Sequence, residues 1–256
     1  MTVNPVAAGG FSQAAATYAR IRPTYARGAI GAMKDMCTPG GLVLDVAAGT
    51  GILTGQLRRA GMEVHAVEPL PAMVGQLRIA LPHVPVVLGV AEALPVATGT
   101  ADMLSVGQGF HWFDADAALL EACRVLRPGG VLALVFNARD DSTPWVHHLT
   151  RLVEDRTGGR PYDDHRERPW DEVVAAAGGF TDLDERRFDN PVPTTIAGVV
   201  ERLRSTSFVA AMGGAERDAL LADARRFLDG EPGLSGDFDY PHETVLYTCR
   251  RRPTPT

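Results

Sequence analysis

Short apolar runs alternate with helical patterns through the first half of the chain, and this alternation limits the possible folds most strongly. The apolar runs are residues 42–47, 63–68, 84–90, 101–108 and 130–137. Between them, apolar residues recur at helical spacing in 52–61, 71–81 and 114–126, and Pro128 to Gly130 are expected to end the last helix. Strands that alternate with helices of this length form right-handed βαβ units. The pattern predicts an α/β, Rossmann-like, mostly parallel sheet with helices on both faces.

The second half of the chain is less regular. Residues 141–165 form a polar segment with several Pro and Gly, residues 169–178 suggest a helix, and 180–188 suggest a strand. Helical patterns fill 194–229, and a last strand is expected at 243–251. Helices inserted between the last two strands predict a lid over the carboxyl edge of the sheet, where open α/β sheets bind ligands. The expected parts are an N-terminal helical arm (1–40), a ligand-binding core (41–140), and the lid helices with the last two strands (141–256).

Composition excludes several classes of function. The 256 residues include 25 Lys and Arg against 31 Asp and Glu, and acidic residues interrupt most arginine pairs. A surface that follows a phosphate backbone needs a continuous basic stripe, so nucleic acid is not an expected partner. No apolar run approaches the roughly 20 residues of a membrane span, and the first residues lack the pattern of a secretion signal. The three scattered cysteines have neither disulfide nor zinc spacing, so a cytoplasmic protein is expected.

A turn rich in small residues follows the first expected strand directly. Its sequence is Asp45-Val46-Ala47-Ala48-Gly49-Thr50-Gly51, which lets the backbone bend tightly and approach a bound molecule. Glu68 ends the second expected strand, where a carboxylate can accept hydrogen bonds from both hydroxyls of a ribose. Together the turn and the acid predict a ligand that contains adenosine.

Asp45 distinguishes between two kinds of adenosine ligand. A dinucleotide-binding turn follows the pattern Gly-x-Gly-x-x-Gly, and Thr54 stands at the third glycine when the pattern starts at Gly49. The pyrophosphate of a dinucleotide would be repelled by Asp45, whereas the ammonium group of S-adenosylmethionine would be attracted. These residues therefore favour S-adenosylmethionine over a nicotinamide dinucleotide as the ligand. They also argue against an oxidoreductase that uses such a dinucleotide.

The same segments resemble the motifs of class I S-adenosylmethionine-dependent methyltransferases. LDVAAGTG resembles the first motif, Glu68-Pro69 with Met73 the second, GVAEALP (89–95) the third, SVGQGFHWFD (105–114) the fourth, and LRPGGVLAL (126–134) the fifth. The opening FSQAAATYARIRPTYA (11–26) is similar to the N-terminal helix and arm of a small-molecule branch, the methyltransferase type 11-like proteins. The resemblance covers residues 11–137, and residues 141–230 match no subfamily.

The resemblance implies a site for S-adenosylmethionine. Gly49 and Gly51 would lie under its methionine and ribose, Asp45 would order the turn and interact with the amino group, and Glu68 would bind the ribose hydroxyls. Ala47 stands where many members of the family have glycine. The residues expected in the site are Tyr18, Arg22, Asp45, Ala47, Gly49, Gly51, Glu68, Pro69, Met73, Ala91, Glu92 and Gln108.

Two groups of these residues have alternative interpretations. Glu92, beside Ala91, would meet the polar edge of the adenine, or would be an acid in the first turn of a helix. Val90 stands where the family often has an acid that binds the adenine amino group. On the arm, Tyr18 would close over the methyl group and Arg22 would pair with the cofactor carboxylate. Alternatively, Arg22 precedes a proline at a helix boundary and is solvated.

His111 is the one candidate for a catalytic residue. An imidazole can take a proton from an acceptor during transfer, although a packing role within the His-Trp-Phe trio is the alternative. Residues expected to line the acceptor pocket, unless they only pack in the core, are Trp112, Trp145 and Phe208. No metal is expected, although the histidines at 147–148, with Asp140 and Asp141, leave a metal site as a minor alternative.

The sequence thus predicts a methyltransferase that acts on a small organic molecule. Oxygen is the expected acceptor atom, because the chain lacks the Asn/Asp-Pro-Pro-Tyr type of motif. Transfer to carbon or nitrogen, and a protein of the same fold that binds the cofactor without transferring the methyl group, remain as alternatives. A monomer or homodimer is expected.

Overall fold

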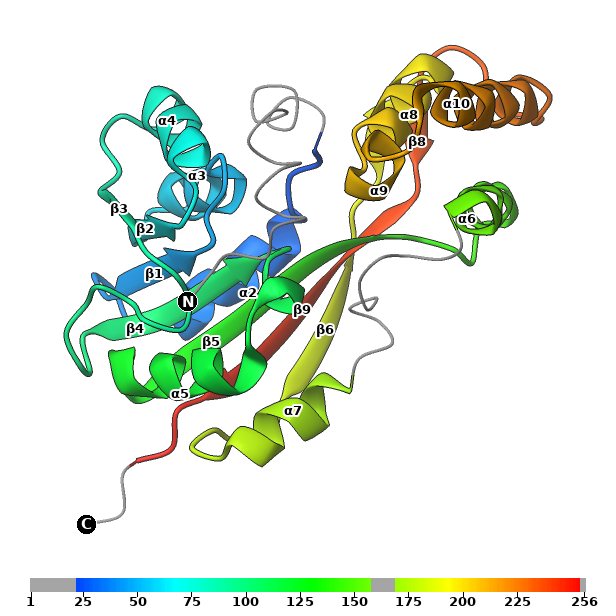
Figure 1. Ribbon diagram of the computed structural model, residues 1–256. Coiled ribbons are helices and arrows are strands. Elements are labelled where there is room, and N and C mark those ends of the chain that lie inside the picture. Colours follow the sequence, from blue (N-terminus) through cyan, green and yellow to red (C-terminus); the bar gives the residue numbers. More distant parts are fainter. Residues whose placement is uncertain (1–21, 158–168, 254–256) are drawn as a thin grey trace.

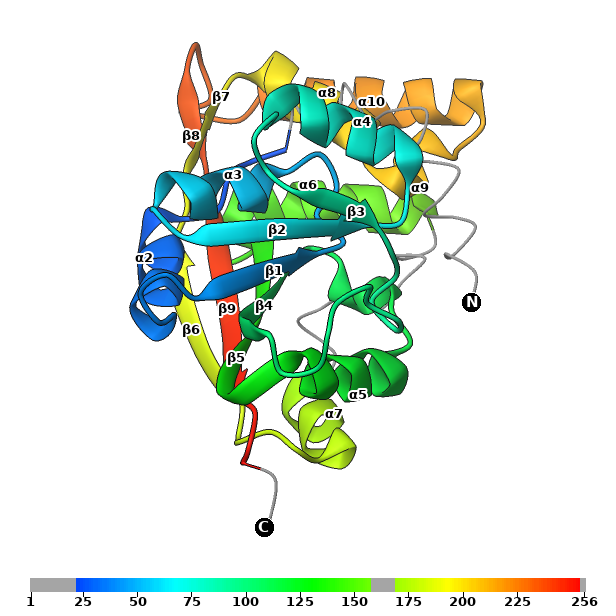
Figure 2. The same cartoon turned by 90° about the vertical axis from the view of Figure 1, so that its left-hand side faces the viewer.

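The chain folds around one twisted sheet, which the computed structural model shows within residues 22–157 and 169–253 (Figures 1 and 2). From edge to edge the strands are β3 (Val86–Leu88), β2 (Glu63–Glu68), β1 (Leu42–Val46), β4 (Ala101–Gly107), β5 (Leu126–Arg139), β9 (His242–Arg250) and β6 (Asp184–Asp189). The first five are mutually parallel, and β9 runs antiparallel to β5 and β6. This confirms the predicted α/β, mostly parallel sheet.

Helices cover both faces of this sheet (Figure 1). On one face lie α2 (Arg27–Met36), α3 (Ile52–Arg59) and α4 (Pro71–Ala80), and on the other lie α5 (Ala115–Val125) and α7 (Trp170–Ala177). Along β1, Val43 packs with α2 and α3, while Leu44 and Val46 pack towards α5. Burial on both faces explains why the strands of the first half are nearly continuous apolar runs.

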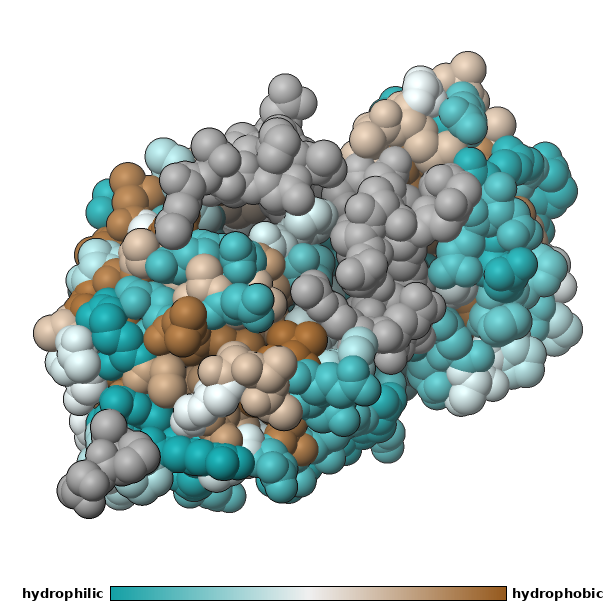
Figure 3. Space-filling view, turned by 60° about the horizontal axis from the view of Figure 1, so that its bottom comes forward, coloured by the Kyte–Doolittle hydropathy of each residue, from teal (hydrophilic) through white to brown (hydrophobic). Residues whose placement is uncertain are grey.

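Further helices form a separate layer beyond the ends of β5 and β9 (Figure 1). This layer, called the helical unit below, contains α6 (Pro144–Thr157), β7 (Val192–Thr194), α8 (Ile196–Arg204), α9 (Ser207–Ala210), α10 (Gly214–Asp229) and β8 (Phe238–Tyr240). Its buried side chains, among them Leu149, Val199 and Leu220, form a core of their own. On the face that Figure 3 shows, most of the surface of the unit is hydrophilic, as expected of amphipathic helices that bury their apolar sides inward.

Several element boundaries differ from the sequence predictions. The strand expected at 84–90 is only three residues long, because Pro85 has no N–H and the chain turns back at Val90, which bridges to Ala93. The helix expected over 114–126 spans Ala115–Val125, but the next strand begins at Leu126 rather than at 130. Pairing with β4 produces this early start, since Leu126 is in register with Ala101.

The second half of the chain contains elements that the sequence pattern did not predict. The polar segment 141–165 includes α6, which packs against α10. The strand expected at 180–188 begins at Asp184, because Phe180 forms only an isolated bridge with Arg251. The small antiparallel pair of β7 and β8 was not predicted either. No helix in the described part of the chain is long and apolar enough to cross a membrane.

Candidate active site

The turn between β1 and α3 exposes bare backbone at the carboxyl edge of the sheet. Ala47, Gly49 and Gly51 have positive φ angles of 54°, 58° and 86°. A Cβ added to Gly49 would meet no atom within 4 Å, so the space in front of this residue is open. Gly51 caps the N-terminus of α3, where the helix dipole and unpaired N–H groups attract negative charge. The turn can therefore approach a ligand closely.

Alanine in the left-handed region at Ala47 is accommodated by another glycine. A Cβ on Gly109 would lie 3.1 Å from the Cβ of Ala47, tighter than ordinary contact. Gly109 follows β4, the neighbour of β1 in the sheet. The methyl group of Ala47, where many members of the family have glycine, thus has room because the loop after β4 carries glycine at position 109.

Asp45 is fully buried and connects the turn to its surroundings. Its Oδ2 accepts a hydrogen bond from the Thr54 hydroxyl on α3 at 2.5 Å, and its Oδ1 accepts one from the Ser105 hydroxyl on β4 at 2.9 Å. Burial raises the pKa of Asp45 to about 6, and the two hydrogen bonds offset part of this rise. Asp45 therefore fixes β1, α3 and β4 relative to one another.

Thr54, which stands at the third glycine of a dinucleotide pattern, is consequently an interior partner of Asp45. Its side chain is fully buried. A glycine there would leave one oxygen of a buried carboxylate without its donor, which costs about 1–3 kcal/mol or more. The mismatch to the dinucleotide pattern thus has a structural reason.

Glu68 lies at the carboxyl end of β2, next to the turn. It is 3% exposed, and its two oxygens each accept a backbone hydrogen bond of 2.9 Å, Oε2 from the N–H of Gly49 and Oε1 from the N–H of Leu70. Burial raises the pKa of Glu68, and the hydrogen bonds from Leu70 and Gly49 oppose this rise. Because a carboxylate oxygen has two acceptor positions, each oxygen can still accept a hydroxyl.

Thr50 is a residue of the turn that the sequence analysis did not assign. Its side chain is 5% exposed, and its Oγ1 has no hydrogen-bond partner in the described part of the chain. Buried hydroxyls are nearly always paired, so this one points to a group supplied from outside the chain. The signal in the sequence was its place between Gly49 and Gly51, directly before the helix.

The loop between β3 and β4 carries Ala91, which is buried, and Glu92, which is half-buried. The Oε1 of Glu92 accepts a hydrogen bond of 3.1 Å from the backbone N–H of Asp114, the N-cap of α5. Met73 is buried on α4, and Pro69 is half-buried directly after β2. These residues, all expected in the cofactor site, follow neighbouring strands at the edge of the sheet beyond Glu68.

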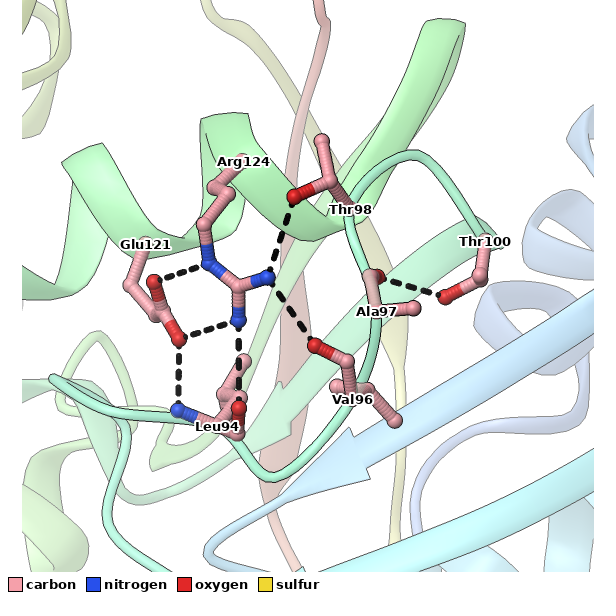
Figure 4. Close-up of polar contacts among 7 residues, drawn as sticks. All are labelled: Leu94, Val96, Ala97, Thr98, Thr100, Glu121 and Arg124. Carbon is pink, nitrogen blue, oxygen red and sulfur yellow. Dashed lines mark hydrogen bonds and ion pairs between the residues drawn. The ribbon is translucent and has the colours of Figure 1, made fainter.

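An ion pair on α5 holds this loop in place (Figure 4). Arg124 Nη2 contacts Glu121 Oε1 at 2.6 Å and donates to the carbonyl of Leu94 at 3.1 Å, and Glu121 accepts from the N–H of Leu94 at 2.6 Å. Arg124 also donates to the carbonyl of Val96 at 2.9 Å. The hydrogen bond from Arg124 lowers the pKa of Glu121. The pair thus ties both backbone groups of Leu94 to α5.

Asn137, near the end of β5, joins several segments at the same edge. It is 8% exposed, and its amide donates to the carbonyl of Thr24 at 3.1 Å and accepts from the hydroxyl of Thr244 at 2.6 Å and from Asn190 at 3.1 Å. Gln108 donates from Nε2 to the carbonyl of Asn137 at 2.9 Å. Asn137 was not among the predicted site residues, and its signal in the sequence is an amide at the end of an apolar strand.

The base of the N-terminal arm is fixed by a second amide. Gln56 on α3 accepts from the N–H of Tyr25 at 2.8 Å and donates to the carbonyl of Tyr25 at 2.7 Å. Arg22 is half-buried and leads directly into this anchored segment, whereas Tyr18 lies outside the described residues. The segment that leads into the predicted arm is therefore held at the carboxyl edge of the sheet.

His111 and Trp112 lie together in the short 3₁₀ helix after β4, η1 (Phe110–Trp112). Both are half-buried, their rings are 4.8 Å apart, and the ring of His111 is 6.4 Å from that of Phe136 on β5. The imidazole therefore lies near the carboxyl ends of β4 and β5.

The other expected acceptor residues lie elsewhere. Trp145 packs in the core of the helical unit, with ring distances of 5.0 Å to Tyr240 and 6.0 Å to Phe238. Phe208 belongs to α9, but its side chain is outside the described part of the structure. His148 stacks on Phe227, and within residues 22–157 and 169–253 no group of three potential metal ligands is found.

Comparison with known proteins identifies the family. Residues 44–134 match the family described as a methyltransferase domain. An uncharacterized methyltransferase of Mycobacterium bovis is 35% identical over 239 residues, which cover 92% of this chain and 93% of that protein. The chain belongs to the class I S-adenosylmethionine-dependent methyltransferases. The predicted cofactor, S-adenosylmethionine, and the predicted enzyme class are thereby confirmed.

Other methyltransferases extend the comparison. A malonyl-[acyl-carrier protein] O-methyltransferase of Methylococcus capsulatus is 32% identical over 175 residues, covering 64% of this chain and 62% of that protein. A structure of an Anaeromyxobacter dehalogenans protein, assigned to the type II methyltransferases, has a TM-score of 0.65, 26% identity, and coverage of 90% and 97%. The fold is also similar to that of phosphoethanolamine N-methyltransferase 2 of Haemonchus contortus bound to S-adenosyl-L-methionine, with a TM-score of 0.61, 15% identity, and coverage of 99% and 60%.

The residues at the carboxyl edge of this methyltransferase fit the cofactor. The open space at Gly49 and the unpartnered hydroxyl of Thr50 lie on the turn, and Glu68 keeps acceptor positions for two hydroxyls on the neighbouring strand. The polar atoms available are thus acceptors on the β2 side and donors at the helix N-terminus. This distribution suits a ribose and a carboxylate, respectively.

Proposed function

We propose that this methyltransferase transfers a methyl group to an oxygen atom of a small organic acceptor. The observation that supports oxygen is His111, an imidazole in the turn after β4, adjacent to the expected methyl-transfer position. An oxygen nucleophile must lose its proton during transfer, and a histidine can accept it near neutral pH. The Methylococcus capsulatus relative, an O-methyltransferase, supports the same choice.

The cofactor-binding roles in this proposal follow the geometry of the edge. The backbone from Ala47 to Gly51 lies under the methionine and ribose, Asp45 orders that backbone, and Glu68 accepts hydrogen bonds from the ribose hydroxyls. We add Thr50, whose hydroxyl donates to the cofactor carboxylate at the N-terminus of α3.

Around these contacts, other residues complete the cofactor site. Pro69 and Met73 pack on the adenine side, and Ala91 and Glu92 lie at its polar edge. The proposed site also includes Tyr18 and Arg22 of the arm and Gln108 of the loop after β4. The carboxylate of Glu92 accepts one hydrogen bond, from the N–H of Asp114. Since a carboxylate has about four acceptor positions, the others can accept from an amino group.

The bound cofactor supplies a methyl group already activated by its sulfonium. The protein therefore has to orient the acceptor oxygen in line with the methyl carbon, which can contribute about 7–11 kcal/mol to catalysis. We propose that the helical unit covers the acceptor and excludes water, because it lies beyond the carboxyl end of β5. Trp112 would contact the acceptor, whereas the packing of Trp145 assigns it to the core of the unit.

The test is a transfer assay with a methyl-¹³C-labelled cofactor and a panel of phenols, carboxylic acids and hydroxy acids. The ¹³C shift of the product distinguishes a methyl group on oxygen from one on nitrogen or carbon, and so decides between the proposal and its alternatives. Folded protein that binds the cofactor but methylates no acceptor would support a non-transferring role. Absence of calorimetric binding of S-adenosylhomocysteine contradicts the proposed function altogether.

Replacing His111 by glutamine is expected to lower kcat by about 100-fold or more, because the proton acceptor is lost. Cofactor affinity should stay unchanged. His83→Gln, at an exposed position after α4, serves as the control and should leave kcat unchanged. Unaltered kcat in His111→Gln would assign this imidazole to packing.

Replacing Gly49 by alanine is expected to weaken cofactor binding, since the added Cβ enters the open space in front of the turn. It also places alanine at a φ of 58°, which costs about 1 kcal/mol of stability. Gly40→Ala is the matched control, because Gly40 has a φ of 74°, no atom within 4 Å of its added Cβ, and a position away from the turn. By calorimetry, the two variants are expected to lose the same stability, whereas only Gly49→Ala loses affinity for the cofactor. Equal affinities in the two variants would place the cofactor elsewhere.

A further inference from the structure

A second cluster of polar side chains lies where the sheet meets the helical unit. Arg139 is the last residue of β5 and is paired in register with His242, the first residue of β9. Tyr240 ends β8, and Arg202 lies on α8. These four residues, called the basic junction below, come from both parts of the protein.

Two polar atoms of the basic junction are buried without a partner. His242 is 4% exposed and Tyr240 is 2% exposed. Neither Nε2 of His242 nor the hydroxyl of Tyr240 has a hydrogen-bond partner within the described residues. An unpaired buried polar group costs about 1–3 kcal/mol, so two on neighbouring side chains require an explanation.

The hydrogen-bonding direction of the His242 ring follows from its other nitrogen. Nδ1 lies 2.9 Å from the backbone carbonyl of Tyr240, which can only accept, so Nδ1 carries the proton. In the neutral ring Nε2 then presents a lone pair and needs a donor. The Tyr240 hydroxyl can donate to an oxygen.

Two arginines contribute positive charge around these atoms. The guanidinium of Arg202 lies 5.6 Å from the centre of the Tyr240 ring. Burial, with a smaller contribution from the positive charges of Arg202 and Arg139, lowers the pKa of His242 to about 3. Such a site attracts an anion, and because it is buried, the interaction is only weakly screened by salt.

The position of the basic junction relates it to the methyl-transfer site. Glu68, on β2, places the nucleoside on one side of β1, whereas β4, β5 and β9 follow on the other side. Neighbouring strands are about 4.8 Å apart, so β5 runs roughly 10 Å to the side of β1. Its last residue, Arg139, lies four residues, or about 13 Å, beyond Val135, which pairs with Gly107 at the end of β4. Arg139 lies two residues beyond Asn137 and therefore on the same face as this residue, which donates to Thr24 at the base of the arm.

We infer that the basic junction binds an anionic oxygen group of the methyl acceptor that also carries a hydroxyl, such as a hydroxycarboxylate or a hydrogen phosphate. The hydroxyl donates to Nε2 of His242, Tyr240 donates to a charged oxygen, and Arg139 and Arg202 supply the opposite charge. This inference rests on the proposed function, because it takes the ligand to be part of the acceptor. It predicts that acceptors are small organic acids or phosphate esters rather than neutral molecules.

Isothermal titration of the full chain, loaded with S-adenosylhomocysteine, tests the inference. The probes are inorganic phosphate, glycolate and acetate at constant ionic strength, and the last lacks the hydroxyl. Phosphate or glycolate is expected to bind, and acetate to bind at least fivefold more weakly than glycolate. Binding of phosphate alone would identify a phosphate ester, and binding of glycolate alone a hydroxy acid.

Variants connect the binding to the basic junction. Tyr240→Phe, which removes one oxygen atom and keeps the ring, and Arg202→Gln should each weaken binding at least tenfold. Arg204→Gln, at an exposed position on the same helix, should bind as the original protein does. Failure of both phosphate and glycolate to bind, or unchanged affinity in Tyr240→Phe and Arg202→Gln, overturns the inference. If S-adenosylhomocysteine still binds in that case, only the inference fails and the proposed function stands. If S-adenosylhomocysteine does not bind either, the proposed function fails.

Discussion

Replacing Glu68 by alanine is expected to weaken the binding of S-adenosylmethionine by at least about 100-fold. A hydrogen bond to a charged group contributes about 1.5–3 kcal/mol, and under the proposed function the variant loses two such bonds to the ribose hydroxyls. It also removes the acceptor of the Gly49 N–H, which helps to hold the turn in its conformation. Isothermal titration with S-adenosylmethionine measures the change, and circular dichroism checks that the variant is folded.

Glu63→Ala is the matched control for this prediction. Glu63 begins the same strand, its side chain is half exposed, and it pairs with Arg58 at the surface. Exposed ion pairs of this kind contribute about 0–1 kcal/mol, so the affinity for the cofactor should not change. A threefold or smaller loss of affinity in Glu68→Ala would show that the ribose is bound by other groups.

The protein is expected to lose stability steeply in weak acid because of His242. Burial and two nearby arginines lower the pKa of its imidazole from 6.5 to about 3. As the pH falls below 6.5, the unfolded chain takes up a proton that the folded chain resists, so the unfolded state is favoured. At 1.36 kcal/mol per pH unit, the effect reaches about 5 kcal/mol once the pH has fallen to about 3. It is fully absent above about pH 7.

Urea unfolding of the original protein and of His242→Gln, at pH 7 and about pH 4.5, measures this contribution. Between these pH values, His242 should account for about 3 kcal/mol of the lost free energy of unfolding, and this part should be missing in the variant. His83→Gln replaces an exposed histidine and should lose as much as the original protein. Equal losses in His242→Gln and the original protein would mean that His242 is protonated in the folded state.

The sheet and the cofactor turn were predictable because short stretches of sequence define them. β2 begins and ends at the predicted residues, since Gly61 precedes it and Pro69 follows it. Parallel order then places the ends of β1 and β2 side by side, which brings Glu68 to Gly49. Local pattern and the handedness of βαβ units were sufficient for this part of the site.

The hydrogen-bond network of Asn137 was not predictable in the same way. Asn137 bonds with Thr24 and Thr244, which are 113 and 107 residues away along the chain. Nothing in the neighbouring sequence distinguishes such an amide from one exposed at the end of a strand. Similarly, α6 was missed because its polar side faces outward and its apolar side matches a helix 70 residues further on.

The sequence by itself determined the alternating fold, the bare turn after β1 and the carboxylate that faces it, because each depends on residues close together in the chain or on neighbouring strands. Tertiary structure alone decided which polar side chains became partners and which stayed unpaired. Asp45 gained two hydroxyl donors from α3 and β4, whereas Tyr240 and His242 were buried beside positive charge with open hydrogen-bonding positions. The physical reason is that burial and pairing depend on the whole set of surrounding elements, which no short segment specifies.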